Sequence, residues 1–311
     1  MNAVDRRPAL SIVIVRFALG DAIESTLRAI EPQGRDMLLE VLCISAGEHA
    51  VAVAWRQRYP AVRWIEAPAH ATPARLRTLG VAASTGELVA CTEDHCVPAP
   101  DWCARIVAAH VAGNVVVGGA IEKGAPVGAS TTGTAASGSA SAGPGAWVAY
   151  LLDYSRYMPP FPAGPVEYVS DCNVSYRRAM LDAVADVWRE EFHETSVHRA
   201  LVQRGVTLRL DPSVLVSQER TIALSSYLLE RTQHGRMFAV ARVRGASRIA
   251  RLKWMMGSLL LPPVIVLRVV ARLRRKGRLG AVPAGVWLPL ACAAVAWSYG
   301  ELKGYVTGRS A

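Results

Sequence analysis

The chain has 311 residues, 51% of them apolar, which is enough for one large domain or for a domain with an appended segment. Lysine and arginine outnumber aspartate and glutamate by 35 to 25, and the last third is especially rich in them. The sequence has neither zinc-finger spacing nor an aromatic RNA-binding signature, so the charge favours an anionic membrane surface over nucleic acid as a partner. The apolar run at residues 11–15 is too short for a secretory signal.

Short apolar runs alternate with helical patterns through the first 121 residues. The runs expected to form strands lie at 10–15, 38–45, 62–66, 88–92 and 115–121. The segments expected to form helices lie at 23–30, 51–59, 74–83 and 102–112. This alternation predicts βαβ units in an α/β fold, with a mostly parallel sheet and helices on both of its faces.

The pattern is less regular after residue 121. Residues 124–145 are almost all Gly, Ala, Ser, Thr and Pro, which predicts a flexible loop without a core. A strand is expected at 166–176, helices at 177–184 and 194–203, and short strands at 206–210 and 214–217. We expect one domain over 1–222 and a basic, apolar helical region over 223–311.

The C-terminal region suggests contact with a membrane. Residues 224–243 are expected to form a helix with a basic face, followed by apolar stretches at 254–271 and 281–299 that are barely long enough to cross a bilayer. Arginine and lysine flank both stretches, and such flanks favour the cytoplasmic side. The preferred reading is a re-entrant or interfacial hairpin with both flanks cytoplasmic. Two transmembrane helices, or a buried helix pair in a soluble protein, are the alternatives.

The most informative stretch is GELVACTEDHCVPAPDW at 86–102. Glu93, Asp94 and His95 follow the expected strand 88–92, and ligands of open α/β sheets bind beyond the carboxyl ends of the strands. Oxygen and imidazole ligands suit a divalent cation. Asp101 is expected to cap a helix that begins at Trp102.

The six cysteines are expected to be buried, reduced thiols. Three of them, Cys91, Cys96 and Cys103, lie near His95, so a zinc site is an alternative for this stretch. No CxxC pair occurs, which weighs against a zinc site.

Residues 10–242 resemble the inverting family-2 glycosyltransferases of the GT-A fold. The resemblance rests on the order and spacing of four motifs. They are SIVIV at 11–15; RTLG at 77–80 with STGE at 84–87; EDH at 93–95 with PAPDW at 98–102; and DCN at 171–173 with YRR at 176–178, followed by HE at 193–194 before Gly205. Glu-x-His replaces the family's Asp-x-Asp, which leaves metal identity and metal dependence open.

The resemblance implies roles for individual residues. Glu93 and His95 would bind a divalent metal, Mg or Mn, that offsets the charge of the leaving diphosphate. Glu194 lies at the position of the catalytic base, for which His193 or His198 could substitute. Six residues would contact the substrates: Arg77, Asp94, Asp171, Asn173, Gln233 and Arg236. Gln233 and Arg236 match only part of the QxxRW motif of processive synthases.

These roles imply a glycosyltransferase at the cytoplasmic face of the membrane, in cell-envelope biogenesis. It would move a sugar from a nucleotide-sugar donor to a lipid-linked or envelope glycan acceptor. A catalytically inactive scaffold of the same fold is one alternative. A nucleotidyltransferase is another, although residues 16–20 lack the glycine-rich basic loop that cradles a triphosphate.

Overall fold

A computed structural model describes residues 7–16, 22–35, 37–47, 49–124, 143–243 and 245–308. Most of the segment expected to be a flexible loop, 124–145, therefore lies outside the described residues. The chain divides into two compact units. The first comprises Met1–Val127 and Tyr157–Glu219, and the second comprises Gly128–Arg156 and Arg220–Ala311. Each unit is described by itself.

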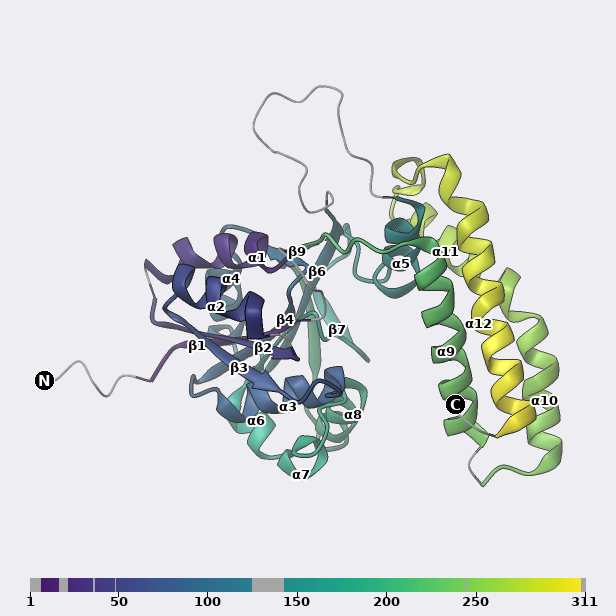
Figure 1. Cartoon of the computed structure of the whole chain (residues 1–311), viewed down its shortest axis with the longest axis horizontal. Helices are drawn as coiled ribbons and strands as arrows, with labels where there is room; N and C mark the ends of the chain where they lie inside the picture. The colour runs from purple at the N-terminus through teal and green to yellow at the C-terminus, as the bar shows by residue number, and fades with distance from the viewer. Residues whose placement is uncertain are drawn as a thin grey trace, which may run out of the picture. The chain divides into compact units, whose positions relative to one another are not determined.

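The first unit is built on one sheet with the strand order β3-β2-β1-β4-β8-β6-β9-β5, and β7 pairs with β9 (Figure 1). The strands are β1 (Leu10–Arg16), β2 (Leu39–Ala46), β3 (Val62–Ala67), β4 (Leu88–Glu93), β5 (Cys96–Pro98), β6 (Val116–Lys123), β7 (Gly164–Val166), β8 (Asn173–Arg177) and β9 (Leu208–Gln218). The helices of this unit are α1 (Ala22–Ile30), α2 (His49–Arg58), α3 (Pro73–Ala83), α4 (Trp102–Val111), α6 (Arg178–Asp182), α7 (Ala185–Trp188) and α8 (Glu194–Gln203), and a 3-10 turn, Glu31–Arg35, follows α1.

The parallel half of the sheet follows the predicted alternation. β3, β2, β1 and β4 are parallel neighbours, and every residue of β1 is buried. The crossover helix α3 packs against β1 and β2. It begins with Thr72, whose hydroxyl accepts a hydrogen bond from the Arg75 amide (3.1 Å), followed by Pro73 at the first helical position. This capped start fixes the face on which α3 carries Arg77.

The other half of the sheet mixes strand directions. β8 lies antiparallel between β4 and β6, and β9 is parallel to β6 but antiparallel to β5 and β7. The predicted strand 166–176 is wrong as one element, because its polar middle forms a turn between β7 and β8. The predicted strands 206–210 and 214–217 are one strand, β9, which bulges after Asp211 where the register with β6 shifts.

The second unit is helical. It contains α5 (Pro144–Asp153), α9 (Leu224–Val243), α10 (Arg248–Leu259), α11 (Leu261–Arg275) and α12 (Trp287–Thr307), with 3-10 turns at Leu279–Ala281 and Ala284–Val286. Helix α12 packs along α9 and also contacts α10 and α11 (Figure 1). The bounds of α9 match the predicted helix 224–243, whereas α5 begins inside the segment expected to be a loop.

The length and composition of the apolar helices bear on whether they could cross a bilayer. Among the described residues, no single helix is long and apolar enough to cross a membrane. The helices Ile249–Leu259 and Leu261–Arg275 reach that length and composition only together, and they are bent by 57° where they meet. The predicted stretch 254–271 falls within this bent pair, and most of 281–299 falls within α12.

Candidate active site

The turn that follows β4 is held by backbone contacts from three directions. The Asp94 amide donates to the Val15 carbonyl (3.1 Å), and the Glu219 amide donates to the His95 carbonyl (2.8 Å). The Thr26 hydroxyl lies within hydrogen-bonding distance of the carbonyls of Asp94 (3.0 Å) and Cys96 (3.1 Å). The three side chains of the EDH motif are buried inside this framework. The motif therefore forms a fixed, partly enclosed site instead of a solvated surface turn.

Arg77 joins two of the predicted site segments. Its Nη2 atom lies 2.8 Å from Glu93 Oε1 and 2.5 Å from Asp171 Oδ2. Burial would lower the pKa of this guanidinium, but the charges of Asp171, Glu93 and Glu194 outweigh burial and raise it. Arg77 thus stays a cation in contact with Glu93 and with Asp171, which follows the EDH motif by about eighty residues. The motifs around 93 and 171 meet at Arg77, and the charge of Glu194, about one hundred residues after the EDH motif, reaches it as well.

His95 bridges the two acidic residues of its own motif. Its Nδ1 lies 3.1 Å from Asp94 Oδ1 and its Nε2 lies 3.2 Å from Glu93 Oε2. Burial would lower the pKa of His95, but its hydrogen bonds to Asp94 and Glu93 outweigh burial and raise it to about 9. Both ring nitrogens of His95 therefore face carboxylates of its own motif, and the metal role predicted for His95 stays a prediction.

Asp171 and Glu194 form the more open side of the cluster. Desolvation raises the pKa of Asp171 to about 7 against the pull of Arg77, although 24% of its side chain still reaches solvent. Glu194 begins α8 and is half-buried, and its charge acts on both Arg77 and Asp171. These two side chains are the less buried acidic groups of the cluster, and the role of Glu194 as base stays a prediction.

The two alternative bases are placed less favourably. His198 is buried, and its Nε2 lies 2.8 Å from the Tyr176 hydroxyl. Burial lowers the pKa of His198 to about 4. His193 is exposed and lies 3.0 Å from Glu191. These contacts are to Tyr176 and Glu191, whereas the charge of Glu194 acts on Arg77 and Asp171, so Glu194 stays the predicted base with the two histidines as alternatives.

The side chain of Asn173 connects neighbouring elements by hydrogen bonds in this structure, although Asn173 was predicted to contact substrate. Its amide nitrogen donates to the carbonyls of Ala120 (2.8 Å) and Val214 (2.9 Å), and its oxygen accepts from Trp102 Nε1 (2.9 Å). The side chain is buried, and both of its N–H groups are used. It ties β8 to β6, to β9 and to the first residue of α4.

The remaining predicted residues lie elsewhere or act differently. Gln233 is exposed and Arg236 half-buried on α9, in the second unit, so their contact with substrate stays a prediction. Asp94 is completely buried beside His95, which it orients. Asp101 precedes α4 but makes no side-chain cap, because its carboxylate pairs with Arg105 Nε (2.7 Å).

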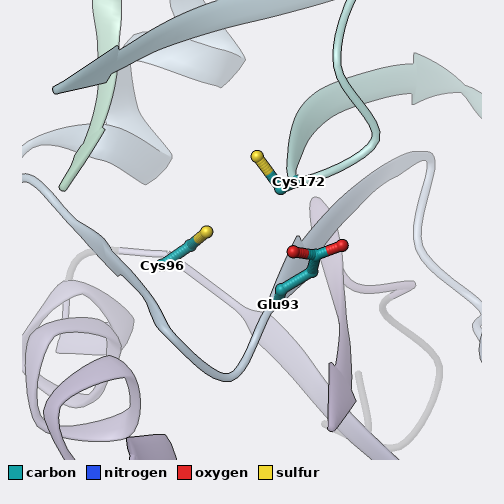
Figure 2. A group of neighbouring side chains, drawn as sticks. All are labelled: Glu93, Cys96 and Cys172. Atoms are coloured by element: carbon teal, nitrogen blue, oxygen red, sulfur yellow. The ribbon is translucent and has the colours of Figure 1, made fainter. Parts of the chain in front are cut away.

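Two cysteines belong to the site. Glu93, Cys96 and Cys172 are buried, and each offers a ligand atom within 4.8 Å of the other two (Figure 2). Among the described residues, this is the group of Asp, Glu, His or Cys side chains whose ligand atoms are close enough together to hold a metal ion. Of the cysteines named for the zinc alternative, Cys96 is in this group, whereas Cys91 and Cys103 are not. Cys172 could have been noticed only through its position in the DCN motif, beside Asp171.

Comparisons with known proteins fit this geometry. The sequence profile described as Glycosyl transferase family 2 matches residues 11–184, which is more than half of the chain. The fold is similar to that of the mannosyltransferase PcManGT from Pyrobaculum calidifontis in complex with GDP-Man and Mn²⁺, with a TM-score of 0.55, 14% identity, and coverage of 96% of this chain and 88% of that chain. It is also similar to GalNAc-T7 with UDP, GalNAc and Mn²⁺, with a TM-score of 0.50, 11% identity, and coverage of 70% and 45%.

No curated protein matches the chain. The solved structures confirm the predicted GT-A fold, and the profile identifies a transferase of sugars instead of the alternative nucleotidyltransferase. Because the profile spans both the EDH motif and the Asp171 segment, the chain belongs to glycosyl transferase family 2.

Proposed function

We propose that the chain transfers a sugar, with inversion, from a nucleotide-sugar donor to a lipid-linked or envelope glycan acceptor at the cytoplasmic face of the membrane. The observation that carries the proposal is the cluster beyond the carboxyl end of β4. There, Glu93 and Asp171 contact the buried cation of Arg77, and the charge of Glu194 also acts on it. The structures of PcManGT and GalNAc-T7 with nucleotide and Mn²⁺ support a donor of this class.

Glu194 acts as the base in this proposal. The acceptor hydroxyl attacks the anomeric carbon and its proton passes to the Glu194 carboxylate. The bond from the anomeric carbon to the diphosphate oxygen breaks, and the nucleoside diphosphate leaves with the electron pair. Position in the first turn of α8 keeps this carboxylate near the positive end of the helix, and its half-burial leaves it accessible to an acceptor.

Arg77 supplies fixed positive charge on the donor side. It is held by Glu93 and Asp171, so little reorganisation is needed when a diphosphate approaches. A divalent cation fits this site through Glu93, with the sulfurs of Cys96 and Cys172 nearby in place of the engaged His95. When bound, such an ion would offset charge on the leaving diphosphate.

The second unit supports the membrane part of the proposal. Its helices expose large apolar side chains beside arginines and lysines, a combination that suits an anionic bilayer surface. The most exposed of them include Leu229, Ile249, Met256, Leu260, Leu267 and Leu288. Gln233 and Arg236 on α9 would contact the acceptor or the diphosphate.

A screen of UDP- and GDP-sugars tests the proposal, with binding measured by calorimetry and turnover by release of nucleoside diphosphate, with and without added divalent metal. One donor should bind and be turned over. Glu194→Gln should keep donor affinity and lower kcat by about 10²-fold to 10⁴-fold, the usual contribution of a general base. Glu190→Gln is the matched control, because Glu190 is exposed and precedes the same helix.

Two outcomes would contradict the proposal. Full activity of the Glu194→Gln variant would remove the base from this site. Absence of both binding and turnover with every donor would favour the catalytically inactive scaffold. That scaffold is the alternative consistent with a Glu93 carboxylate already paired with Arg77 and His95.

A further inference from the structure

We infer that Glu93, Cys96 and Cys172 form a mixed carboxylate–thiolate cation site that selects a borderline ion such as Zn²⁺ over Mg²⁺ or Mn²⁺. The inference deepens the proposed function, because it places the ion of this chain at the donor end of the site. It differs from the predicted Glu93–His95 pair in both ligands and metal preference. The test below needs no turnover.

The fold brings the three side chains together from separate segments. Glu93 ends β4 and Cys96 begins β5, on either side of the two-residue turn Asp94–His95. Cys172 directly precedes β8, which is antiparallel to β4 with Thr92 opposite Asn173. Glu93 directly follows Thr92 and Cys172 directly precedes Asn173, so both lie at the end of this ladder. Figure 2 shows the Cys96 and Cys172 sulfurs and the Glu93 carboxylate close to one another.

The spacing approaches that of a formed site. In a tetrahedral zinc site with bonds of about 2.3 Å to sulfur and about 2.0 Å to oxygen, the ligand atoms lie about 3.5 to 3.8 Å apart. The three ligand atoms here lie within 4.8 Å of one another without an ion. Side-chain rotations can therefore close the site without moving the strands. Three protein ligands leave a fourth position for water or a phosphate oxygen, as in zinc sites that act on substrates.

Charge balance supports a divalent ion in this position. Two thiolates and one carboxylate would carry three negative charges. A divalent ion would offset two of them, and Arg77 (2.8 Å from Glu93) and His95 (3.2 Å from Glu93) place further positive charge beside the carboxylate, with Arg77 shared with Asp171. Thiolate ligands favour zinc, whereas Mg²⁺ and Mn²⁺ favour carboxylates, carbonyls and water. All three ligands are buried, which adds to the preference for an ion that readily sheds its water.

Neighbouring groups already orient two of the ligands. The Ser170 hydroxyl lies 3.3 Å from the Cys172 sulfur, and the Thr92 hydroxyl donates to the Cys172 carbonyl (2.9 Å). The Cys96 carbonyl lies 3.1 Å from the Thr26 hydroxyl. Such outer contacts fix the ligands of metal sites and typically change metal affinity about 10-fold to 100-fold when they are lost.

Titration of the metal-free chain with Co²⁺ tests the inference by spectroscopy. We expect one Co²⁺ per chain, with a thiolate-to-cobalt charge-transfer band and the visible bands of a tetrahedral ion. Zn²⁺ should displace it at equal concentration, and excess Mg²⁺ should not. Cys96→Ser and Cys172→Ser should each weaken the charge-transfer band and lower affinity at least about 10-fold, and Ser170→Ala should lower affinity about 10-fold.

Cys103→Ser and Cys292→Ser are the controls, one buried and one exposed, and both should retain the full spectrum. Circular dichroism confirms that each variant is folded. The inference fails if wild type shows no thiolate band, if the band survives in both Cys96→Ser and Cys172→Ser, or if Mg²⁺ displaces Co²⁺ as readily as Zn²⁺ does. A thiolate–cobalt spectrum without turnover of any donor would contradict the proposed function and support this site. Donor turnover without a thiolate–cobalt spectrum would contradict this site and support the proposed function.

Discussion

Asn173 offers the clearest test of a single residue whose predicted role and observed contacts differ. Replacement by alanine removes three buried hydrogen bonds and leaves Trp102 Nε1 and the carbonyls of Ala120 and Val214 without this partner. Leaving buried polar groups unpaired costs about 1–3 kcal/mol each, so we expect Asn173→Ala to lower the free energy of unfolding by at least about 2 kcal/mol. Urea denaturation monitored by tryptophan fluorescence measures it.

The control for Asn173 is Asp101→Ala, one residue before Trp102. Asp101 is exposed and its carboxylate pairs with Arg105 across one helical turn, so its loss should cost less than about 1 kcal/mol. Donor affinity of the folded Asn173→Ala variant, measured by calorimetry, separates the two roles. If Asn173→Ala has normal stability but no longer binds the donor, the result would support the predicted contact between Asn173 and substrate.

The buried side chain of His110 should make the free energy of unfolding depend on pH. It is buried, with Nδ1 donating to the Asn114 carbonyl (2.9 Å) and Nε2 lying 2.9 Å from the Ser175 hydroxyl. Burial lowers its pKa from 6.5 to about 4, so between these values the unfolded chain binds a proton that the folded chain does not. The contribution of His110 to the free energy of unfolding is therefore complete above pH 6.5 and is lost as the pH drops toward 4, by at most about 3 kcal/mol.

Urea denaturation at several pH values, compared with His110→Gln, checks this slope. Glutamine takes up no proton, so the variant should lose less stability between pH 6.5 and pH 4 than wild type does. His198, whose pKa burial also lowers to about 4, supplies a second contribution that remains in the variant. His70→Gln is the control at an exposed histidine. Equal slopes in wild type and His110→Gln would contradict the assignment.

Glycines in α9 and α12 allow these two helices to pack backbone against backbone. A Cβ atom on Gly300 would overlap the Thr232 carbonyl, and one on Gly235 would overlap the Trp297 carbonyl. Alanine at either position forces the helices apart, which typically costs about 1–3 kcal/mol. We expect Gly300→Ala to lower the Tm of the second unit, measured by calorimetry, where the two units can appear as separate transitions.

Gly257→Ala in α10 is the matched control for the helix pair. A Cβ atom there meets nothing within 4 Å, and Gly257 is exposed. Alanine is favoured over glycine in helices by about 1 kcal/mol, so this variant should hold or raise the Tm. A Gly300→Ala variant as stable as Gly257→Ala would show that the close approach of α9 and α12 is absent in solution.

Sequence patterns predicted local elements better than their assembly. The parallel strands and the helices α8 and α9 follow from hydrophobic periodicity, which needs only nearby residues. The turn between β7 and β8 and the continuous β9 did not follow, because a polar interruption looks alike in a loop and in a bulge. The pairing of α9 with α12 depends on contacts about sixty residues apart, which periodicity does not report.

The whole site shows the same limit. Motif order placed Glu93, Asp171 and Glu194 in one site, because family resemblance carries long-range information that composition lacks. It did not predict Arg77 bridging Glu93 and Asp171, the closed pairing of His95, or the partnership of Cys96 with Cys172. Those depend on strand register and on which face of α3 meets the sheet. The family resemblance therefore predicts which segments form the site, whereas the contacts among their side chains depend on how this chain packs.

The second unit is predicted to bind anionic membranes through α10. Leu252, Met256 and Leu259 lie four and three residues apart, which places them on one side of the helix, and each is more than half exposed (58%, 60% and 58%). Burying such side chains in a bilayer interface contributes up to about 1.5–3 kcal/mol each. The double variant Leu252→Glu with Met256→Glu should therefore weaken binding to phosphatidylglycerol vesicles more than about 10-fold in a flotation assay.

Val111→Glu is the control for this surface. Val111 is 79% exposed in the first unit, so this variant adds one negative charge, half that of the double variant, to an exposed apolar position outside α10. Its vesicle binding should equal that of wild type. Binding should also be weaker to neutral phosphatidylcholine vesicles and should fall as salt is raised, because the basic side chains of the second unit contribute electrostatically. Equal binding by wild type and the double variant, or equal binding to both lipids, would remove the membrane from the proposed function.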